Sequence, residues 1–261
     1  MPNFDKHPAG NFVWFELSTS DQAAAKQFYS DLFGWQAQDS SMGPEMTYTM
    51  FRLNGRDAAG AYTMKPEDRQ MGVPPNWLIY VAVPSADAAI ASALEHGGNA
   101  MSPAIDIPNV GRMAVLQDPV GAVFAVFEPG NHKGVGIYGE PNAFCWADLQ
   151  TPDRERTAPF YSSMFGWELL PGKDKDASGY LHIKNGEQYI GGLPEARNVP
   201  PSVMPHWLPY IQCTDCAAQT AKAEQLGGRV IVPATTVPEQ LSYSVVADPQ
   251  GAIFALFAPA H

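Results

Sequence analysis

One sequence pattern occurs twice in this 261-residue chain, and the repeat restricts the possible folds more than any other feature. Residues 11–129 recur as residues 143–259, and a small drift in the spacing is explained by two short loop deletions. The repeated residues are Trp14 and Trp146, Asp21 and Asp153, Phe28-Tyr29 and Phe160-Tyr161, Gly34-Trp35 and Gly166-Trp167, Trp77 and Trp207, and Asp118-Pro119 and Asp248-Pro249. The repeat predicts two similar domains, residues 1–130 and 142–261, joined by a linker at 131–141.

The composition describes a globular protein rather than a fibrous or membrane-spanning one. Hydrophobic residues make up 45% and charged residues 16%, and the 24 prolines and 23 glycines suit many short strands joined by turns. The formal net charge of −11 offers no attraction to nucleic acid or to an anionic membrane surface. We find no apolar run near the roughly 18 residues of a membrane span and no signal-peptide pattern. These features predict a cytoplasmic protein with neither nucleic acid nor membrane as a partner.

The three cysteines do not suggest a disulfide framework, because their number is odd and their positions are not repeated. Cys213 and Cys216 form a CxxC pattern, but the corresponding residues of the first repeat are Val83 and Ala86. Cysteines that replace apolar residues are expected to pack in the core. We interpret all three, Cys145 included, as structural.

Each repeat contains two successive strand–helix–strand patterns. The first opens with an aromatic strand at 12–17, continues with a helix that Gly34 ends, and adds a strand at 47–53 followed by Asn-Gly, a strong hairpin signal. In the second repeat, Thr151 is the predicted helix cap and Pro152 the first helical residue. The second pattern in the first repeat comprises a strand at 77–83, a helix at 85–96, and strands around 113–116 and 123–127. The chain therefore reads as four units of an α+β fold, in which helices cover one sheet face and leave the other free to enclose a ligand.

These residues resemble the vicinal-oxygen-chelate superfamily, which includes glyoxalase I, bleomycin-resistance proteins and extradiol dioxygenases. The resemblance rests on an Asp-helix block ending in Phe-Tyr and Gly-Trp and on a closing DPxG block, both of which occur twice in the same order: Asp21, Phe28-Tyr29, Gly34-Trp35 and Asp118–Gly121; Asp153, Phe160-Tyr161, Gly166-Trp167 and Asp248–Gly251. It implies four βαβββ units that form two cupped mixed sheets related by pseudo-two-fold symmetry. Such a chain is similar to a fused dimer, and we expect a monomer or a homodimer.

Members of this family that use a metal hold it on the concave sheet face. The resemblance carries the metal-ligand positions over to Trp14, Gly60, Leu78 and Ala125 in the first repeat, and to Trp146, Gly191, Leu208 and Ala255 in the second. None of these residues is a His, Asp, Glu or Cys of the kind that a divalent metal requires. We therefore expect no cofactor and a metal-independent protein, with a divalent metal at non-standard positions as the alternative.

Strand alternation predicts which side chains face the inside of each cup. The predicted ligand-binding residues are Trp14, Glu16, Tyr80 and Phe127, with their second-repeat partners Trp146, Asp148, Tyr210 and Phe257. Tyr48 and Tyr180 are expected to line the cups as well. A tryptophan beside an acid suits a flat or cationic molecule. Alternatively, the acids hold neighbouring strands together by hydrogen bonds, and the tyrosines merely close the rim.

The functional hypothesis is that the cups bind a small apolar or aromatic molecule, as in sequestration-type resistance proteins, with no catalytic residue assigned. The first alternative is an enzyme, a lyase, isomerase or oxygenase, with a metal held by Glu16, Asp148 and His182. His206 could join Asp148 and His182 in a metal or acid–base site. The second alternative is a structural or regulatory role, with both cups filled by their own tryptophans.

Overall fold

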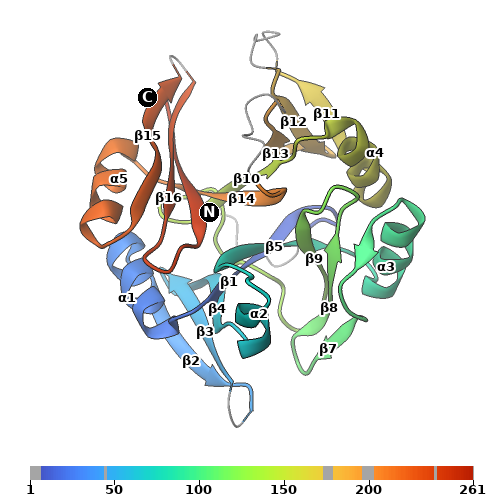
Figure 1. The fold of residues 1–261 in the computed structure, drawn as a ribbon, viewed down its shortest axis with the longest axis horizontal. Helices are drawn as coiled ribbons and strands as arrows, with labels where there is room; N and C mark the ends of the chain where they lie inside the picture. Colours follow the sequence, from blue (N-terminus) through green and yellow to red (C-terminus); the bar gives the residue numbers. More distant parts are fainter. Residues whose placement is uncertain (1–6, 44–45, 173–178, 196–202, 238–239, 261) are drawn as a thin grey trace.

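Each repeat folds into its own curved mixed sheet with helices packed on one face (Figure 1). The structure is a computed structural model that describes residues 7–43, 46–172, 179–195, 203–237 and 240–260. The two sheets contain nine and eight strands, so the α+β architecture with two mixed sheets is confirmed. In the described residues, no helix is long and apolar enough to cross a membrane.

The first sheet has the strand order β2-β3-β4-β1-β5-β9-β8-β6, with β7 paired to β8. Its elements are β1 (Phe12–Thr19), α1 (Gln22–Phe33), β2 (Gln36–Ser41), β3 (Thr47–Leu53), β4 (Arg56–Thr63), α2 (Pro66–Gln70), β5 (Asn76–Ala82), α3 (Ala86–Glu95), β6 (Asn99–Ala100), β7 (Ile105–Ile107), β8 (Gly111–Gln117) and β9 (Val123–Pro129). The central strand β1 runs antiparallel to β5 and parallel to β4. This pairing joins the two units of the repeat into one sheet.

The second sheet repeats that topology, with the order β11-β12-β13-β10-β14-β17-β16-β15. Its elements are β10 (Phe144–Gln150), α4 (Arg154–Phe165), β11 (Glu168–Pro171), β12 (Leu181–Asn185), β13 (Gln188–Leu193), β14 (His206–Gln212), α5 (Cys216–Gln225), β15 (Arg229–Val237), β16 (Leu241–Ala247) and β17 (Ile253–Pro259). Here β10 and β14 are the central antiparallel pair.

An aspartate is the N-cap residue of the first helix in both repeats. The Asp21 side chain accepts a hydrogen bond from the backbone N–H of Ala24 at 3.0 Å, a standard N-cap contact. The prediction for the second repeat was wrong, since α4 begins at Arg154 and its cap is Asp153. The Thr151 hydroxyl instead accepts a hydrogen bond from the Asp153 N–H at 3.3 Å, which shapes the turn before the helix.

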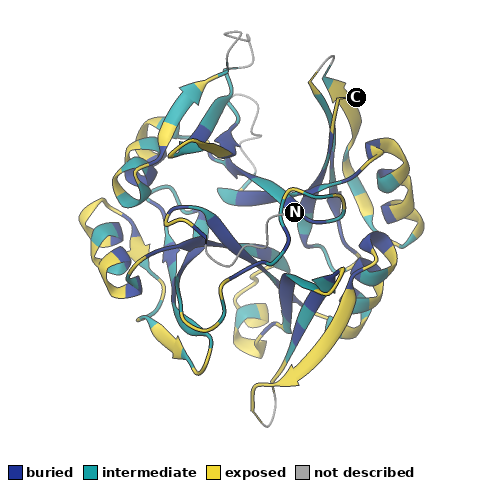
Figure 2. Ribbon diagram, turned by 180° about the vertical axis from the view of Figure 1, so that it is seen from behind, coloured by how far each residue is buried: buried dark blue, intermediate teal, exposed yellow. Residues whose placement is uncertain are grey.

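Helices of one repeat pack beside helices of the other. Helix α1 lies next to α5, and α3 lies next to α4, as Figure 1 shows at the two sides of the molecule. Buried residues concentrate on the central strands and inner helix faces, whereas the outer helix faces and β2 are exposed (Figure 2). The core is therefore shared between the two repeats.

Most of the repeated aromatic residues build this shared core, and their contacts are reciprocal. The Tyr29 hydroxyl donates to Asp248 Oδ2 at 3.0 Å and accepts from Trp77 Nε1 at 3.0 Å. In the same way, Tyr161 donates to Asp118 at 3.3 Å and accepts from Trp207 at 3.0 Å. The Asp-helix block of each repeat thus contacts the DPxG block of the other repeat, as pseudo-two-fold symmetry requires.

Candidate ligand-binding cups

The first cup is the face of the first sheet that carries Trp14, Glu16 and Tyr80. Glu16 lies on β1, and each of its carboxylate oxygens accepts a hydrogen bond from a tyrosine on another strand. Tyr48 on β3 donates to Oε1 at 2.8 Å, and Tyr80 on β5 donates to Oε2 at 2.6 Å. Trp14 Nε1 in turn donates to the Tyr48 hydroxyl at 3.0 Å. One acid therefore links three strands of the cup.

The second cup, the face that carries Trp146, Asp148 and Tyr210, has the same cluster with a shorter acid. Tyr180 donates to Asp148 Oδ1 at 2.6 Å, and Tyr210 donates to Oδ2 at 2.8 Å. Trp146 Nε1 lies 2.9 Å from both Asp148 Oδ1 and the Tyr180 hydroxyl. The indole therefore reaches the acid directly here, whereas in the first cup it reaches only the tyrosine.

Burial perturbs the ionisation of both clusters. Desolvation raises the pKa of Glu16 and of Asp148 above their ordinary values, and the hydrogen bonds from the tyrosines offset part of this rise. Desolvation also raises the pKa of Tyr80 and Tyr210 well above 10.0, and the neighbouring acid raises it further. The tyrosines therefore remain neutral hydrogen-bond donors near pH 7.

A glycine opposite each acid makes room for one tyrosine hydroxyl. Gly60 pairs with Glu16 across β4 and β1, and a Cβ at this position would lie 1.9 Å from the Tyr48 hydroxyl oxygen. Gly192 pairs with Asp148, and its Cβ would lie 1.8 Å from the hydroxyl oxygen of Tyr180. The counterpart of Gly60 is therefore Gly192, which corrects the expected Gly191 by one residue.

One row of side chains crosses each cup at the position of the acid. The row across the first cup is Met50, Gly60, Glu16 and Leu78, and the row across the second is His182, Gly192, Asp148 and Leu208. In the described parts of the chain, no three His, Cys, Asp or Glu residues form a group that could hold a metal ion. Metal sites in proteins usually need at least three such ligands.

The two histidines considered for a metal site differ in position. His182 lies in the row of Asp148, and its ring is 6.1 Å from the Trp146 ring and 5.0 Å from the Tyr180 ring. His206 lies at the beginning of β14, where its Nδ1 is 2.8 Å from the Met204 carbonyl oxygen and burial lowers its pKa. His182 is thus the histidine beside the second acid cluster.

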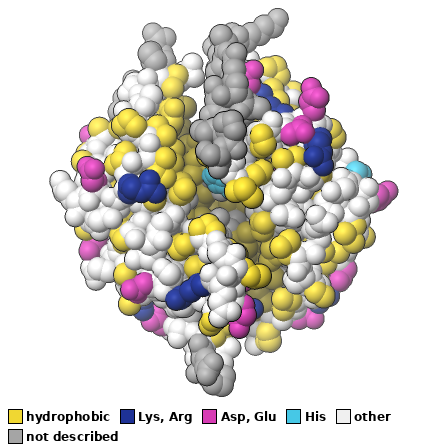
Figure 3. Space-filling view, viewed as in Figure 1, with side chains coloured by type: hydrophobic (Ala, Val, Ile, Leu, Met, Phe, Trp, Pro, Cys, Tyr) yellow, Lys and Arg dark blue, Asp and Glu magenta, His cyan; other side chains and the backbone are white. Residues whose placement is uncertain are grey.

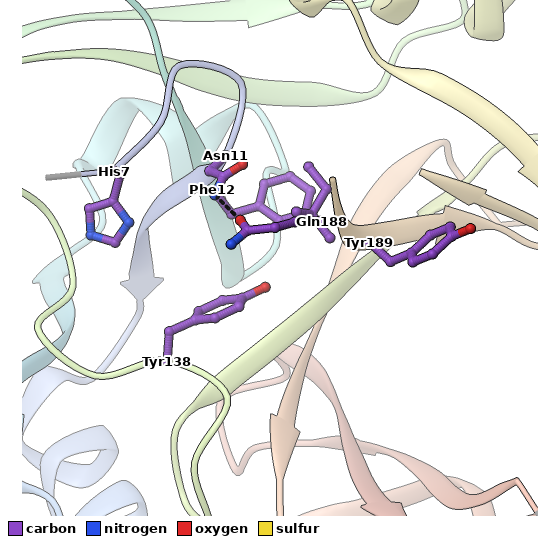
Figure 4. A pocket seen from close by; sticks show the side chains of 7 residues that line it. His7, Asn11, Phe12, Tyr138, Gln188 and Tyr189 are labelled. Carbon is purple, nitrogen blue, oxygen red and sulfur yellow. Dashed lines mark hydrogen bonds between the residues drawn. The ribbon is translucent and has the colours of Figure 1, made fainter. Parts of the chain in front are cut away.

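Two cavities lie away from both acid clusters. One, of about 320 Å³, is situated where the N-terminal segment meets β13 (Figure 4), and it is lined by His7, Asn11, Phe12, Tyr138, Gln188, Tyr189 and Ile190. The other, of about 450 Å³, lies along residues 106–112 and 128–131, at the ends of β7, β8 and β9. Neither is lined by Glu16 or Asp148.

All three cysteines are free thiols. Cys213 and Cys216 are buried where β14 leads into α5, and the Cys213 thiol donates to the Phe257 carbonyl at 3.4 Å. Their burial agrees with packing in the core.

The fold, two curved mixed sheets in tandem, is that of a glyoxalase-like protein, and the family models agree. The model described as "Glyoxalase/Bleomycin resistance protein/Dioxygenase superfamily" matches residues 11–126, and one described as "Glyoxalase-like domain" matches residues 146–257. The chain belongs to this superfamily and has two glyoxalase domains in tandem.

Two relatives match over almost the whole chain. The protein named "Putative glyoxylase CFP32" from Mycobacterium tuberculosis (strain CDC 1551 / Oshkosh) is 34% identical, over 100% of this chain and 99% of the relative. "Anthracycline biosynthesis protein DnrV" from Streptomyces peucetius is 31% identical, over 94% of this chain and 91% of the relative. The similarity extends through both repeats.

Solved structures share the fold at low sequence identity. A Mn(II)-bound glyoxalase from Novosphingobium aromaticivorans has a TM-score of 0.64 at 14% identity and covers 96% of this chain and 82% of its own. The 2,3-dioxygenase LapB from Pseudomonas sp. KL28 has a TM-score of 0.64 at 13% identity and covers 97% of this chain and 94% of its own. At these identities the likeness establishes the fold alone.

Proposed function

We propose that this protein binds a small apolar or aromatic molecule in its cups without a metal at the acid. The observation that carries the proposal is the pair of acid clusters. Each carboxylate already accepts hydrogen bonds from two tyrosine hydroxyls, at 2.6 to 2.8 Å. A carboxylate engaged in this way is a poor metal ligand, because binding a cation would require these hydrogen bonds to break or rearrange.

The residues around each acid suit a flat ligand. Trp14 and Trp146 lie beside the acids. The Trp146 ring is partly exposed and offers a face on which an aromatic molecule can stack. The acid–tyrosine hydrogen bonds hold the surrounding strands in place, so that a binding surface is largely formed in advance. A relative named for anthracycline biosynthesis supports an aromatic ligand for this chain as well.

The proposal is tested by metal analysis together with ligand binding. Purified protein is incubated with Ni(II), Zn(II), Mn(II) or Fe(II), desalted and analysed by plasma mass spectrometry. Binding of 1,4-dihydroxyanthraquinone, a neutral flat aromatic molecule, is then measured by equilibrium dialysis. We expect no retained metal and saturable binding, unchanged by Leu94→Ala at an exposed site on α3. About one tightly held metal ion per chain, or no saturable binding, would contradict the proposal.

A metal-dependent enzyme is the second candidate, and one observation favours it in the second cup. Asp148 and His182 lie in the same row across β10, β13 and β12, so two possible ligands share one face. Retained metal that is lost in both Asp148→Asn and His182→Gln would support this candidate. Metal analysis of these two variants therefore separates the two functions.

A further inference from the structure

We infer that the second cup alone binds the ligand, a neutral planar aromatic molecule, and that His132 of the linker closes the first cup. This inference rests on the proposed function and assigns it to one of two similar sites. Its basis is a difference in exposure between matched residues, together with the contacts that cause the difference.

The matched residues are buried in the first cup and accessible in the second. Trp14, Tyr80 and Phe127 are 6%, 5% and 4% exposed. Their counterparts Trp146, Tyr210 and Phe257 are all partly exposed. A ligand must reach a binding surface, and the same three positions are accessible only in the second cup. Figure 3 shows hydrophobic side chains along a furrow in the upper half of the molecule.

The linker lies against two of the three buried side chains of the first cup. The His132 ring meets the Trp14 ring edge to face at a centroid distance of 4.8 Å and lies 6.4 Å from the ring of Phe127. Trp146 also has a histidine neighbour, at 6.1 Å, but His182 belongs to β12 of the same sheet. Trp146 therefore contacts a histidine of its own sheet, whereas Trp14 contacts a histidine of the linker.

Several contacts hold His132 in this position. Its Nε2 lies 3.5 Å from Asp57 Oδ2, a contact without hydrogen-bond geometry, and Asp57 Oδ1 accepts a hydrogen bond from Arg52 Nε at 2.8 Å. The pair with His132 and the charge of Arg52 lower the pKa of Asp57, so the carboxylate is charged near pH 7. The His132 backbone N–H donates to the Val110 carbonyl at 3.2 Å. The side chain and the backbone are therefore both attached to the first domain.

The second cluster favours a neutral ligand over a cationic one. Asp148 accepts hydrogen bonds from Tyr180, Tyr210 and Trp146, so three of its roughly four acceptor positions are occupied. A cation would have little free negative charge to pair with, whereas an uncharged ring can stack on the exposed aromatic side chains.

Binding stoichiometry tests which cup is used. Equilibrium dialysis with 1,4-dihydroxyanthraquinone is expected to give one molecule per chain in the wild type and an affinity roughly tenfold lower in Trp146→Phe. His132→Ala is expected to raise the number bound toward two, while Lys133→Ala, an exposed neighbour, leaves it at one. Two molecules bound by the wild type, or binding unaffected by Trp146→Phe, would overturn this inference and leave the proposed function intact. No binding by the wild type would overturn both.

Residue-specific oxidation tests the closure without any ligand. Limited N-bromosuccinimide treatment followed by peptide mass mapping reports how quickly each tryptophan reacts. We expect Trp146 to be oxidised several-fold faster than Trp14, and His132→Ala to remove most of that difference. Equal rates in the wild type, or an unchanged Trp14 rate in His132→Ala, would show that the linker does not close the first cup.

Discussion

At the residue scale, each cup is centred on one acid that holds strands together through tyrosine hydroxyls. The strand pattern predicted the inward facing of Glu16 and Tyr80, and the structure places both on the same face. Tyr48 was harder to place, because its hydroxyl reaches Glu16 by occupying the space that a Cβ at Gly60 would fill. A repeated tyrosine with a repeated glycine twelve residues later was the available signal in the sequence, since Tyr48 and Gly60 recur as Tyr180 and Gly192.

Alanine at these glycines should displace the tyrosine. Because the Cβ of Gly60→Ala would lie 1.9 Å from the Tyr48 hydroxyl oxygen, the ring must move and the acid loses a donor. We expect the free energy of unfolding, measured in urea, to fall by about 1–3 kcal/mol. The double variant Gly60→Ala/Tyr48→Phe should lose less than the sum of the single losses. Additive losses would mean that the two side chains do not compete for this space.

The acids should make stability depend on pH. Burial raises the pKa of Asp148, so the folded protein binds this proton more tightly than the unfolded chain does. The resulting stabilisation is complete below the ordinary value of 3.8 and is lost as pH rises through the higher folded value. Asp148→Asn cannot titrate at this position, so its stability relative to wild type should increase between pH 3.8 and the higher folded pKa by up to about 1.4 kcal/mol per pH unit, and should level off above that pKa. Urea unfolding at a series of pH values checks this, and parallel curves for the two proteins would contradict it.

At the scale of elements, the helices and the DPxG turns join the two halves. Asp248 uses Oδ1 to accept three backbone N–H groups of its own turn, from Gln250, Gly251 and Ala252. Its second oxygen accepts the hydroxyl of Tyr29 from α1. The Asp248 side chain thus stabilises its own turn and binds a helix of the other repeat. This contact explains physically why the Asp-helix block and the DPxG block occur together in each repeat.

Removing one of these hydroxyls should destabilise the boundary between the halves. Tyr29→Phe leaves Asp248 Oδ2 and the Trp77 N–H without this buried partner, so we expect a loss of about 1–3 kcal/mol in the free energy of unfolding. Tyr161→Phe, at the matched position, should cost a similar amount, and the exposed Tyr189→Phe should cost almost nothing. Chemical denaturation of the three variants measures this, and equal losses for Tyr29 and Tyr189 would refute it.

At the scale of the whole molecule, the two domains share one core. The Phe15 and Phe144 rings, from the central strands of different sheets, stack at a centroid distance of 4.0 Å. Trp35 Nε1 donates to the Asn142 carbonyl, and Trp167 Nε1 donates reciprocally to the carbonyl of Gly10. Neither half can lose its structure without exposing apolar surface of the other.

The halves should therefore unfold together. We expect differential scanning calorimetry of the full chain to give a single transition, whose calorimetric and van't Hoff enthalpies agree. Tyr29→Phe should lower the midpoint of that one transition. Two resolved transitions, with only one of them shifted by the variant, would show that the domains are energetically independent.

The sequence by itself determined the tandem organisation, the α+β fold and the faces of the central strands. These features follow from local signals, namely the repeat, the alternation of side chains and the glycines that end helices. Local signals placed the cap of α4 two residues early, because Thr151 and Asp153 are both good caps and only the folded turn selects between them.

Only the tertiary structure decided what the repeated residues contact. It directs Tyr29 and Tyr161 to the opposite half, brings two tyrosines to each acid, and lays His132 over Trp14 but not over Trp146. The physical reason is that two repeats with the same pattern of motif residues specify similar sheets, whereas access to each cup depends on residues distant in sequence. Contacts of that kind leave no periodic pattern in the chain.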